Sequence, residues 1–202
     1  MIPKKAGDQG QAFPVYIVVV AGMLFAAFAF FAVGQAALTR SNAQGAADAA
    51  ALAAAGDARD HLLPGLDFTK LGPEDWARIL DGNWLDAAGA CGAAASFAAQ
   101  NDASSTCTPA MPRFTVQVRT NGTVGRSVIP GTSSMHGTAT ATAVIESRCR
   151  LGPPASGAGG SSDKPDPVEI RCTGGSVITF DPLNPDPWRI LARSLFDVRL
   201  VN

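Results

Sequence analysis

The side chains of this chain whose types are best suited to chemistry are its four cysteines and two histidines. His61 follows the sequence DARD. His136 lies in a connection rich in Gly, Ser and Thr, near Ser133 and Ser134. Nearness in sequence does not supply the geometry of a catalytic triad. The chain also lacks a nucleophile elbow, a phosphate-binding loop, a dinucleotide fingerprint and a metal-ligand motif. We therefore expect a protein that is not an enzyme and uses no cofactor.

The cysteines are even in number, which in an oxidising compartment indicates two disulfide bonds. Four cysteines allow three pairings, and we expect the sequential one, Cys91 with Cys107 and Cys149 with Cys172. In the chain-entropy model a disulfide that closes a loop of about 15–25 residues contributes about 3 kcal/mol. A zinc site is the alternative, but the sequence lacks the paired C-x2-C spacing typical of such sites.

Residues 12–33 form an uncharged apolar stretch. A helix of about 20 residues crosses the hydrocarbon core of a bilayer, whereas the apolar part of a secretory signal has about 7–15 residues. The length therefore predicts a transmembrane helix in the cell membrane. Lys4 and Lys5 precede the stretch, so the positive-inside tendency places residues 1–11 in the cytoplasm and the C-terminal part outside.

Two other interpretations of this stretch remain open. Gly34-Gln35-Ala36 is a small-x-small triplet, and cleavage after Ala36 by an ordinary signal peptidase would release a secreted protein. The stretch could instead be the core helix of a soluble protein, although core helices of small proteins usually have a polar face.

An alanine-rich segment follows, and alanine has the highest helix propensity. We assign residues 34–62 to an alanine-rich helical segment, in which the helix itself should end at about Arg59. An isolated helix of this kind is marginal in water, so it needs a neighbour, either its own domain or another subunit. Asp48 is expected to be solvated on this helix or to pair with a cation on a neighbouring surface.

Residues 63–202 are predicted to form an extracytoplasmic domain of helices and a small antiparallel sheet. The segments RFTVQVRT and GTATATAVIESRCR alternate as half-buried strands do, and alanines line one face of the second. Asn121-Gly122 predicts a two-residue hairpin turn, after which the next strand would be short, bulged or absent. A flexible Pro/Gly/Ser loop is expected at residues 152–167.

The last part of the chain predicts three more elements. VEIRC and VITF are expected to form a hairpin closed by Gly174-Gly175. A short helix is expected to carry Trp188, Leu191 and Leu195, and FDVRLV is expected to be a final strand. The predicted fold class is therefore α+β: a long transmembrane helix that continues into an alanine-rich extracytoplasmic helix, then a small helix-plus-antiparallel-sheet domain.

The first quarter of the chain resembles the N-terminal segment of TadG-like proteins, which belong to the Tad (tight adherence, Flp-type) pilus assembly group of bacteria. In that group a glycine precedes an apolar helix, and an alanine-rich stretch of the form Q-x-A-A-D-A-A-A-L-A follows. The residues that match here are Gly10, Gln44, Ala46, Ala47, Asp48, Ala49, Ala50, Ala51, Leu52 and Ala53.

The resemblance also bears on processing of the N-terminus. Related TadE- and TadF-like pseudopilins are cut after a glycine and carry a glutamate at the fifth position beyond the cut. The corresponding bond would join Gly10 and Gln11, but the fifth residue is Val15, and the first glutamate of the chain is Glu74. The departure disfavours cleavage and favours an uncleaved, anchored component.

The resemblance thus implies a membrane-anchored, pilin-like component of Tad pilus assembly that acts through protein–protein contacts. Its expected partners are membrane lipid, other pilus or secretion components, and a second copy through the N-terminal helix. The formal net charge of -1 gives no reason to expect nucleic acid. A membrane-tethered binding or adhesion module unrelated to pili is the alternative function.

Overall fold

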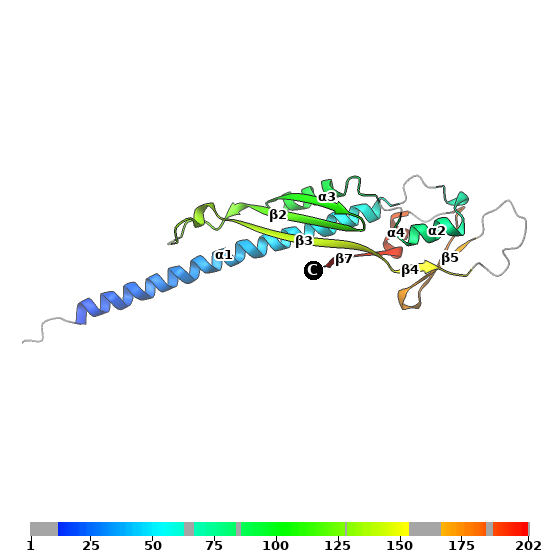
Figure 1. Cartoon of the computed structure of the whole chain (residues 1–202). Coiled ribbons are helices and arrows are strands. Elements are labelled where there is room, and N and C mark those ends of the chain that lie inside the picture. Colours follow the sequence, from blue (N-terminus) through cyan, green and yellow to red (C-terminus); the bar gives the residue numbers. More distant parts are fainter. Residues whose placement is uncertain are drawn as a thin grey trace, which may run out of the picture.

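The computed structural model describes residues 12–62, 67–83, 86–127, 129–153, 167–184 and 188–201. Its longest element is helix α1, Ala12–Asp60, which has 49 residues and is therefore about 70 Å long. Figure 1 shows that the N-terminal part of α1 projects from the rest of the molecule, whereas its C-terminal part lies against a sheet. The predicted continuation of the apolar stretch into an alanine-rich helix is confirmed, and so is the α+β fold class.

The remaining described elements are short. The helices are α2 (Pro73–Leu80), α3 (Ala90–Gln100) and α4 (Trp188–Leu195), with 3-10 turns η1 (Phe68–Lys70), η2 (Thr132–Ser134) and η3 (Thr173–Gly175). The strands are β1 (Ala103–Ala110), β2 (Arg113–Thr123), β3 (His136–Ser147), β4 (Cys149–Leu151), β5 (Val168–Cys172), β6 (Val177–Phe180) and β7 (Phe196–Val201). They form two antiparallel sheets, ordered β1-β2-β3-β7 and β4-β5-β6.

The C-terminal half of α1 is buried along one face made of alanine. The buried positions recur at intervals of three or four residues, as one face of an α-helix requires. This face packs on β2 and β3, and α1 also packs along α3. The domain thus supplies the neighbour that an alanine-rich helix needs. The buried alanines are Ala43, Ala46, Ala47, Ala50, Ala51, Ala54, Ala55 and Ala58.

The larger sheet has one apolar face, and that face meets α1. In β2 the side chains of Phe114, Val116 and Val118 are fully buried, in the alternation that the sequence predicts. In β3 the buried side chains include Ala141 and Ala143. Large side chains from one strand and small ones from the next therefore share the space beneath the helix.

The hairpin predicted at Asn121-Gly122 is wrong. Both residues lie inside β2, which continues to Thr123, with a register shift between Arg119 and Thr123. The backbone N–H of Asn121 donates to the carbonyl of Asp102 (2.8 Å), and its side-chain amide donates to the carboxylate of Asp102 (3.1 Å). These contacts with the turn before β1 hold the pair extended, so long-range hydrogen bonding overrides the local turn preference.

At the end of the molecule opposite the projecting part of α1, the core continues into a group of aromatic side chains. The rings of Phe68, Trp76 and Phe180 lie together, with Phe180 centred 5.1 Å from each of the other two. Trp76 is buried there. The hairpin between β5 and β6 is confirmed, and Gly174 and Gly175 adopt φ values of 82° and 83° that favour glycine.

Candidate membrane and assembly surface

The projecting part of α1 is covered with exposed large apolar side chains. Within the described residues, α1 is the one helix long and apolar enough to be a candidate membrane span. A water-exposed apolar surface this continuous marks a site for lipid or protein contact. The exposed side chains before Arg40 are Phe13, Val15, Tyr16, Ile17, Val18, Val19, Val20, Met23, Leu24, Phe25, Phe28, Phe30, Phe31, Val33 and Leu38.

The helix changes from exposed to packed where β3 begins. A Cβ atom added at Gly137 would lie 2.4 Å from the backbone oxygen of Thr39 and 3.1 Å from the Cβ of Ala43. The backbone N–H of Gly137 donates to the hydroxyl of Thr120 (2.9 Å), which fixes the strand beside the helix. His136 Nδ1 lies 2.8 Å from the carbonyl oxygen of Thr120, so this histidine also contacts Thr120. We call this close approach of β3 to α1 the junction at Gly137.

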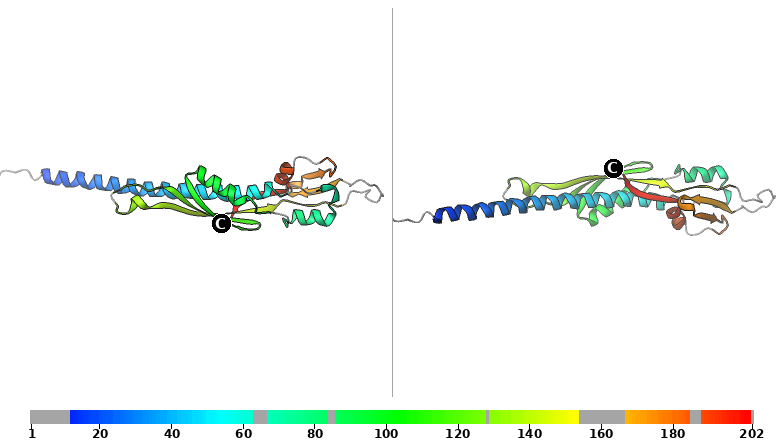
Figure 2. Two further views of the ribbon diagram at one scale, coloured as in Figure 1. Left: turned by 90° about the horizontal axis from the view of Figure 1, so that it is seen from above. Right: turned by 90° about the horizontal axis from the view of Figure 1, so that it is seen from below.

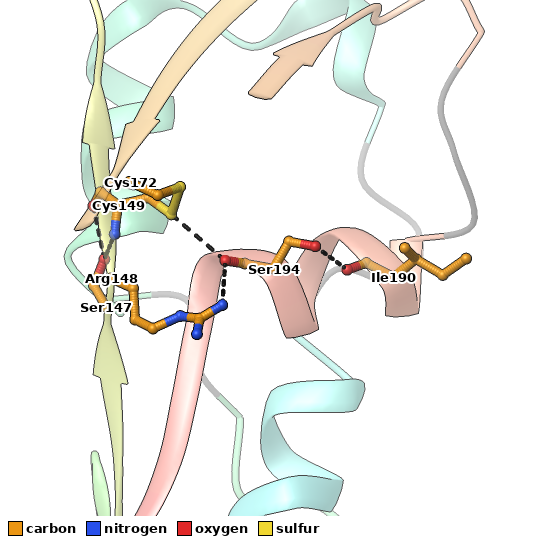
Figure 3. The surroundings of a disulfide bond; sticks show 6 residues. All are labelled: Ser147, Arg148, Cys149, Cys172, Ile190 and Ser194. Carbon is orange, nitrogen blue, oxygen red and sulfur yellow. Dashed lines mark hydrogen bonds between the residues drawn. A yellow bond between two sulfur atoms is a disulfide. The ribbon is translucent and has the colours of Figure 1, made fainter. Parts of the chain in front are cut away.

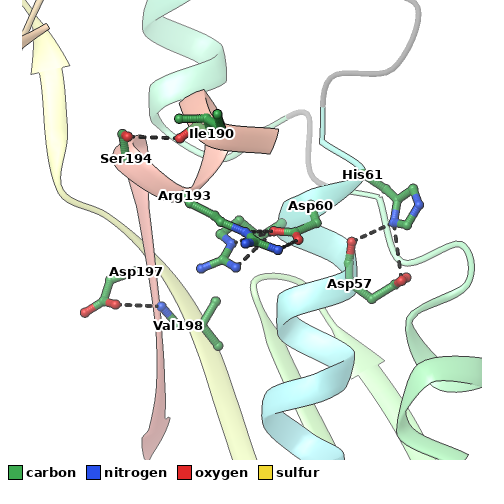
Figure 4. Close-up of polar contacts among 9 residues, drawn as sticks. Asp57, Asp60, His61, Ile190, Arg193, Ser194, Asp197 and Val198 are labelled. Carbon is green, nitrogen blue, oxygen red and sulfur yellow. Dashed lines mark hydrogen bonds and ion pairs between the residues drawn. The ribbon is translucent and has the colours of Figure 1, made fainter. Parts of the chain in front are cut away.

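An ion pair ties the C-terminal end of α1 to α4 (Figure 4). Arg193 of α4 donates two hydrogen bonds to the carboxylate of Asp60, at 3.3 Å from Nε and 2.5 Å from Nη2. Arg59 also lies 2.9 Å from this carboxylate. The side chain of Asp60 is only 16% exposed, so the pair lies partly out of water. Together with the junction at Gly137, it holds the packed half of α1 at both ends.

Two pairs of cysteines lie at bonding distance. The sulfur atoms of Cys91 on α3 and Cys107 on β1 are 1.99 Å apart, and those of Cys149 on β4 and Cys172 on β5 are 1.94 Å apart. Figure 3 shows the second pair beside the C-terminal end of α4. There the carbonyl oxygen of Ser194 accepts a hydrogen bond from the Arg148 guanidinium (3.2 Å) and lies 3.5 Å from the Cys149 sulfur.

An open groove of about 840 Å³ runs past this second pair. Its lining includes Arg148, Arg150 and Arg171 from the smaller sheet region and Asp81 from the segment after α2. One of these arginines, Arg171, is already paired with Glu169 at 2.8 Å. The lining contains no nucleophile with an adjacent base, so the groove offers charge but no arrangement for covalent catalysis.

The histidines occupy structural positions. His61 Nδ1 lies 2.9 Å from the carbonyl oxygen of Asp57 and 3.3 Å from its carboxylate, at the end of α1. His136 lies far along the chain, at the start of β3, as described above. Among the residues that the structure describes, no group of three His, Cys, Asp or Glu side chains is placed to hold a metal ion.

The remaining residues singled out from the sequence are distributed as follows. Gly10 and Gln11, at the disfavoured prepilin-type cleavage position, lie outside the described residues. Val15 is exposed on the projecting part of α1. Asp48 is half-buried and accepts a hydrogen bond from Gln44 (2.7 Å). The junction at Gly137 is not predicted by the sequence, because a glycine at the start of a strand does not identify the helix it will approach.

Fold and surface together define an α+β protein whose long N-terminal helix is half exposed and apolar, and half buried. Residues 10–57 match the family model described as putative Flp pilus-assembly TadE/G-like, which confirms the resemblance predicted from the sequence over this segment. The match relates this N-terminal segment, which lies mostly in α1, to proteins of Flp pilus assembly. No curated protein and no solved structure matches the chain significantly.

Proposed function

We propose that this protein is a membrane-anchored, pilin-like component of Tad pilus assembly that works through protein–protein contacts. The observation that carries the proposal is the division of α1 into an exposed apolar half and a buried alanine half within one helix. The exposed half has the length and composition to lie in a bilayer. The buried half makes the helix part of the domain core, so a domain built this way is rigidly joined to its anchor.

The proposed orientation places the sheet domain outside the cytoplasm. Lys4 and Lys5 precede the apolar stretch, and the positive-inside tendency assigns that end to the cytoplasm. The two cysteine pairs at bonding distance also suit an oxidising compartment. Both arguments point to the same side of the membrane.

We also propose that the N-terminus is not processed between Gly10 and Gln11, because Val15 replaces the glutamate that the resemblance leads one to expect. Intact-mass measurement of protein purified from membranes tests this directly. The unprocessed mass is the expected result. A mature chain that begins at Gln11 would overturn the proposal, and one that begins at Ala37 would show secretion after signal-peptide cleavage.

The role in pilus assembly is tested by deleting the gene in its bacterial host and imaging surface filaments. We expect the deletion strain to lose filaments or make fewer, and re-expression of the wild-type chain to restore them. Unchanged filaments would remove the protein from pilus assembly and favour the alternative, a membrane-tethered adhesion module. Adhesion measured in the same strains separates loss of filaments from loss of a direct adhesive contact.

A further inference from the structure

The connection between β2 and β3 reaches past the start of β3 along α1. Its described residues are 124–127 and 129–135, and they include the short turn η2. Figures 1 and 2 show this connection beside α1, displaced from the sheet toward the projecting N-terminal part of the helix. The sheet domain therefore extends alongside a part of α1 that precedes the junction at Gly137.

Burial varies along the part of α1 that precedes this junction. Ala32 is only 2% exposed, although its neighbours Phe31 and Val33 are exposed. It lies seven residues before Thr39 and eleven before Ala43, so all three share the face of α1 that meets the domain. Elsewhere on this part of α1, Ala26, Ala27 and Ala36 are exposed and Ala29 is half-buried. The β2–β3 connection is the described part of the domain that extends toward the projecting part of the helix (Figures 1 and 2).

The length of the apolar stretch gives the level of a bilayer along α1. The apolar stretch, residues 12–33, measures about 33 Å as a helix, close to the hydrocarbon thickness of about 30 Å. Ala32 therefore lies at the outer boundary of the hydrocarbon core. The β2–β3 connection, which extends along α1 toward the projecting apolar part, therefore approaches that boundary and the lipid headgroups.

The chemistry of the connection suits this environment. Ile129 and Met135 are 46% and 55% exposed, so two large apolar side chains of this short segment are open to a partner. Several polar groups of the connection form hydrogen bonds with one another. Ser127 Oγ accepts a hydrogen bond from the backbone N–H of Ile129 (3.0 Å), and the hydroxyl of Thr132 donates to the carbonyl of Ile129 (3.1 Å). Internal hydrogen bonds lower the cost of bringing backbone into a less polar medium.

We propose that the β2–β3 connection is a second membrane contact, with Ile129 and Met135 inserted at the lipid headgroup boundary. The proposal rests on the proposed membrane span of α1. Arg126 is exposed in the same connection, where its guanidinium can bind a lipid phosphate. The occupant of this surface is thus the bilayer that surrounds α1. Two contacts would fix the rotation of the domain about the helix axis and its height above the membrane.

The test uses the full chain reconstituted in vesicles of phosphatidylcholine and phosphatidylglycerol. An environment-sensitive fluorophore is attached, under non-reducing conditions, to one of four single variants: I129C, M135C, F25C and V177C. Phe25 lies in the exposed apolar half of α1, and Val177 is exposed in the β5–β6 hairpin at the opposite end of the molecule. The four wild-type side chains are all exposed, so none of the substitutions removes a core contact.

The proposal predicts a blue-shifted emission for the labels at positions 25, 129 and 135, and water-like emission at position 177. Water-like emission at both 129 and 135 with a blue shift at 25 would overturn the second contact while leaving the membrane anchor in place. Water-like emission at position 25 would overturn the anchor and, with it, the proposal that depends on it.

Discussion

Gly137 is the residue at which sheet and helix come closest, and its missing side chain makes that approach feasible. The strand passes the carbonyl of Thr39 at a distance that leaves no room for a Cβ atom. Backbone atoms on both sides are fixed, on α1 by the helix and on β3 by the hydrogen bond from Gly137 to Thr120. A larger residue would have to push the two elements apart.

Gly137→Ala is therefore expected to destabilise the protein by about 1–3 kcal/mol, the usual cost of overpacking a fixed contact. Urea unfolding followed by circular dichroism measures the change. Gly45→Ala is the matched control, because Gly45 lies on the same helix with nothing within 4 Å of an added Cβ. Alanine also has the higher helix propensity, so G45A should be neutral or slightly stabilising. Equal effects of the two substitutions would contradict the close approach.

A second residue-scale prediction concerns pH. Arg199 of β7 donates two hydrogen bonds to the carboxylate of Glu146 on β3, at 2.8 Å from Nε and 2.5 Å from Nη2. These hydrogen bonds lower the pKa of Glu146 below its ordinary value of 4.5. Since the folded-state pKa is the lower one, the stabilisation is present above pH 4.5 and is lost as the pH falls through the lowered pKa.

We therefore expect Glu146→Gln to lower the urea midpoint at neutral pH and to leave it unchanged in acid below the lowered pKa. Arg199→Gln should give the same pH dependence, because it removes the other half of the same pair. The effect will be small, since both side chains are exposed and the pair is screened by solvent. A difference from wild type that stays constant across this pH range would exclude the pair as its cause.

At the scale of elements, sequence patterns predict those that carry their own periodicity. The alternation of Phe114, Val116 and Val118 identifies β2, and the alanine tract identifies the packed half of α1. Strand β1, with the sequence ASSTCTPA, has no such pattern and is not predicted. β1 is joined to β2 by only two residues, 111–112, and it forms by pairing with β2 along its whole length, which its own side-chain pattern does not reveal.

A turn prediction also fails where contacts with another segment, rather than local preference, decide the structure. Asn121-Gly122 has a strong local preference for a hairpin, yet its groups bond to Asp102, a residue about twenty positions earlier in the chain. At Gly174-Gly175 the backbone N–H of Cys172 donates to the carbonyl of Ser176 across the turn (2.9 Å), and there the hairpin forms as predicted. A local signal holds where tertiary contacts leave it undisturbed.

The proposed disulfide between Cys91 and Cys107 gives an element-scale prediction, because it joins α3 to β1. Replacing both cysteines by serine should cost about 3 kcal/mol, by the loop-entropy relation. Thermal unfolding measures the loss. Wild type treated with a thiol reductant should lose at least as much stability as the double variant, because the reductant also breaks the proposed Cys149–Cys172 bond. Non-reduced, denatured wild type should show no free thiol. Four titratable thiols in that sample would refute both proposed bonds.

At the scale of the whole molecule, α1 belongs to two environments at once. Its first half exposes side chains such as Phe25 and Phe30, and its second half lies under the sheet. The exposed half can be predicted from sequence, because length and lack of charge decide it. The junction at Gly137 and the course of the β2–β3 connection cannot, because the first depends on which strand meets the helix and the second on how far the connection extends along it.

The central claim is that the exposed half of α1 anchors the protein in a membrane. The most direct measurement expresses the full chain in its bacterial host, washes isolated membranes with alkaline carbonate, and assays pellet and supernatant by immunoblot. Peripheral proteins leave the membrane under this treatment, whereas helices that cross the bilayer stay. The account predicts that the chain remains in the membrane pellet. Its release into the supernatant, or its recovery from the medium, would contradict the account.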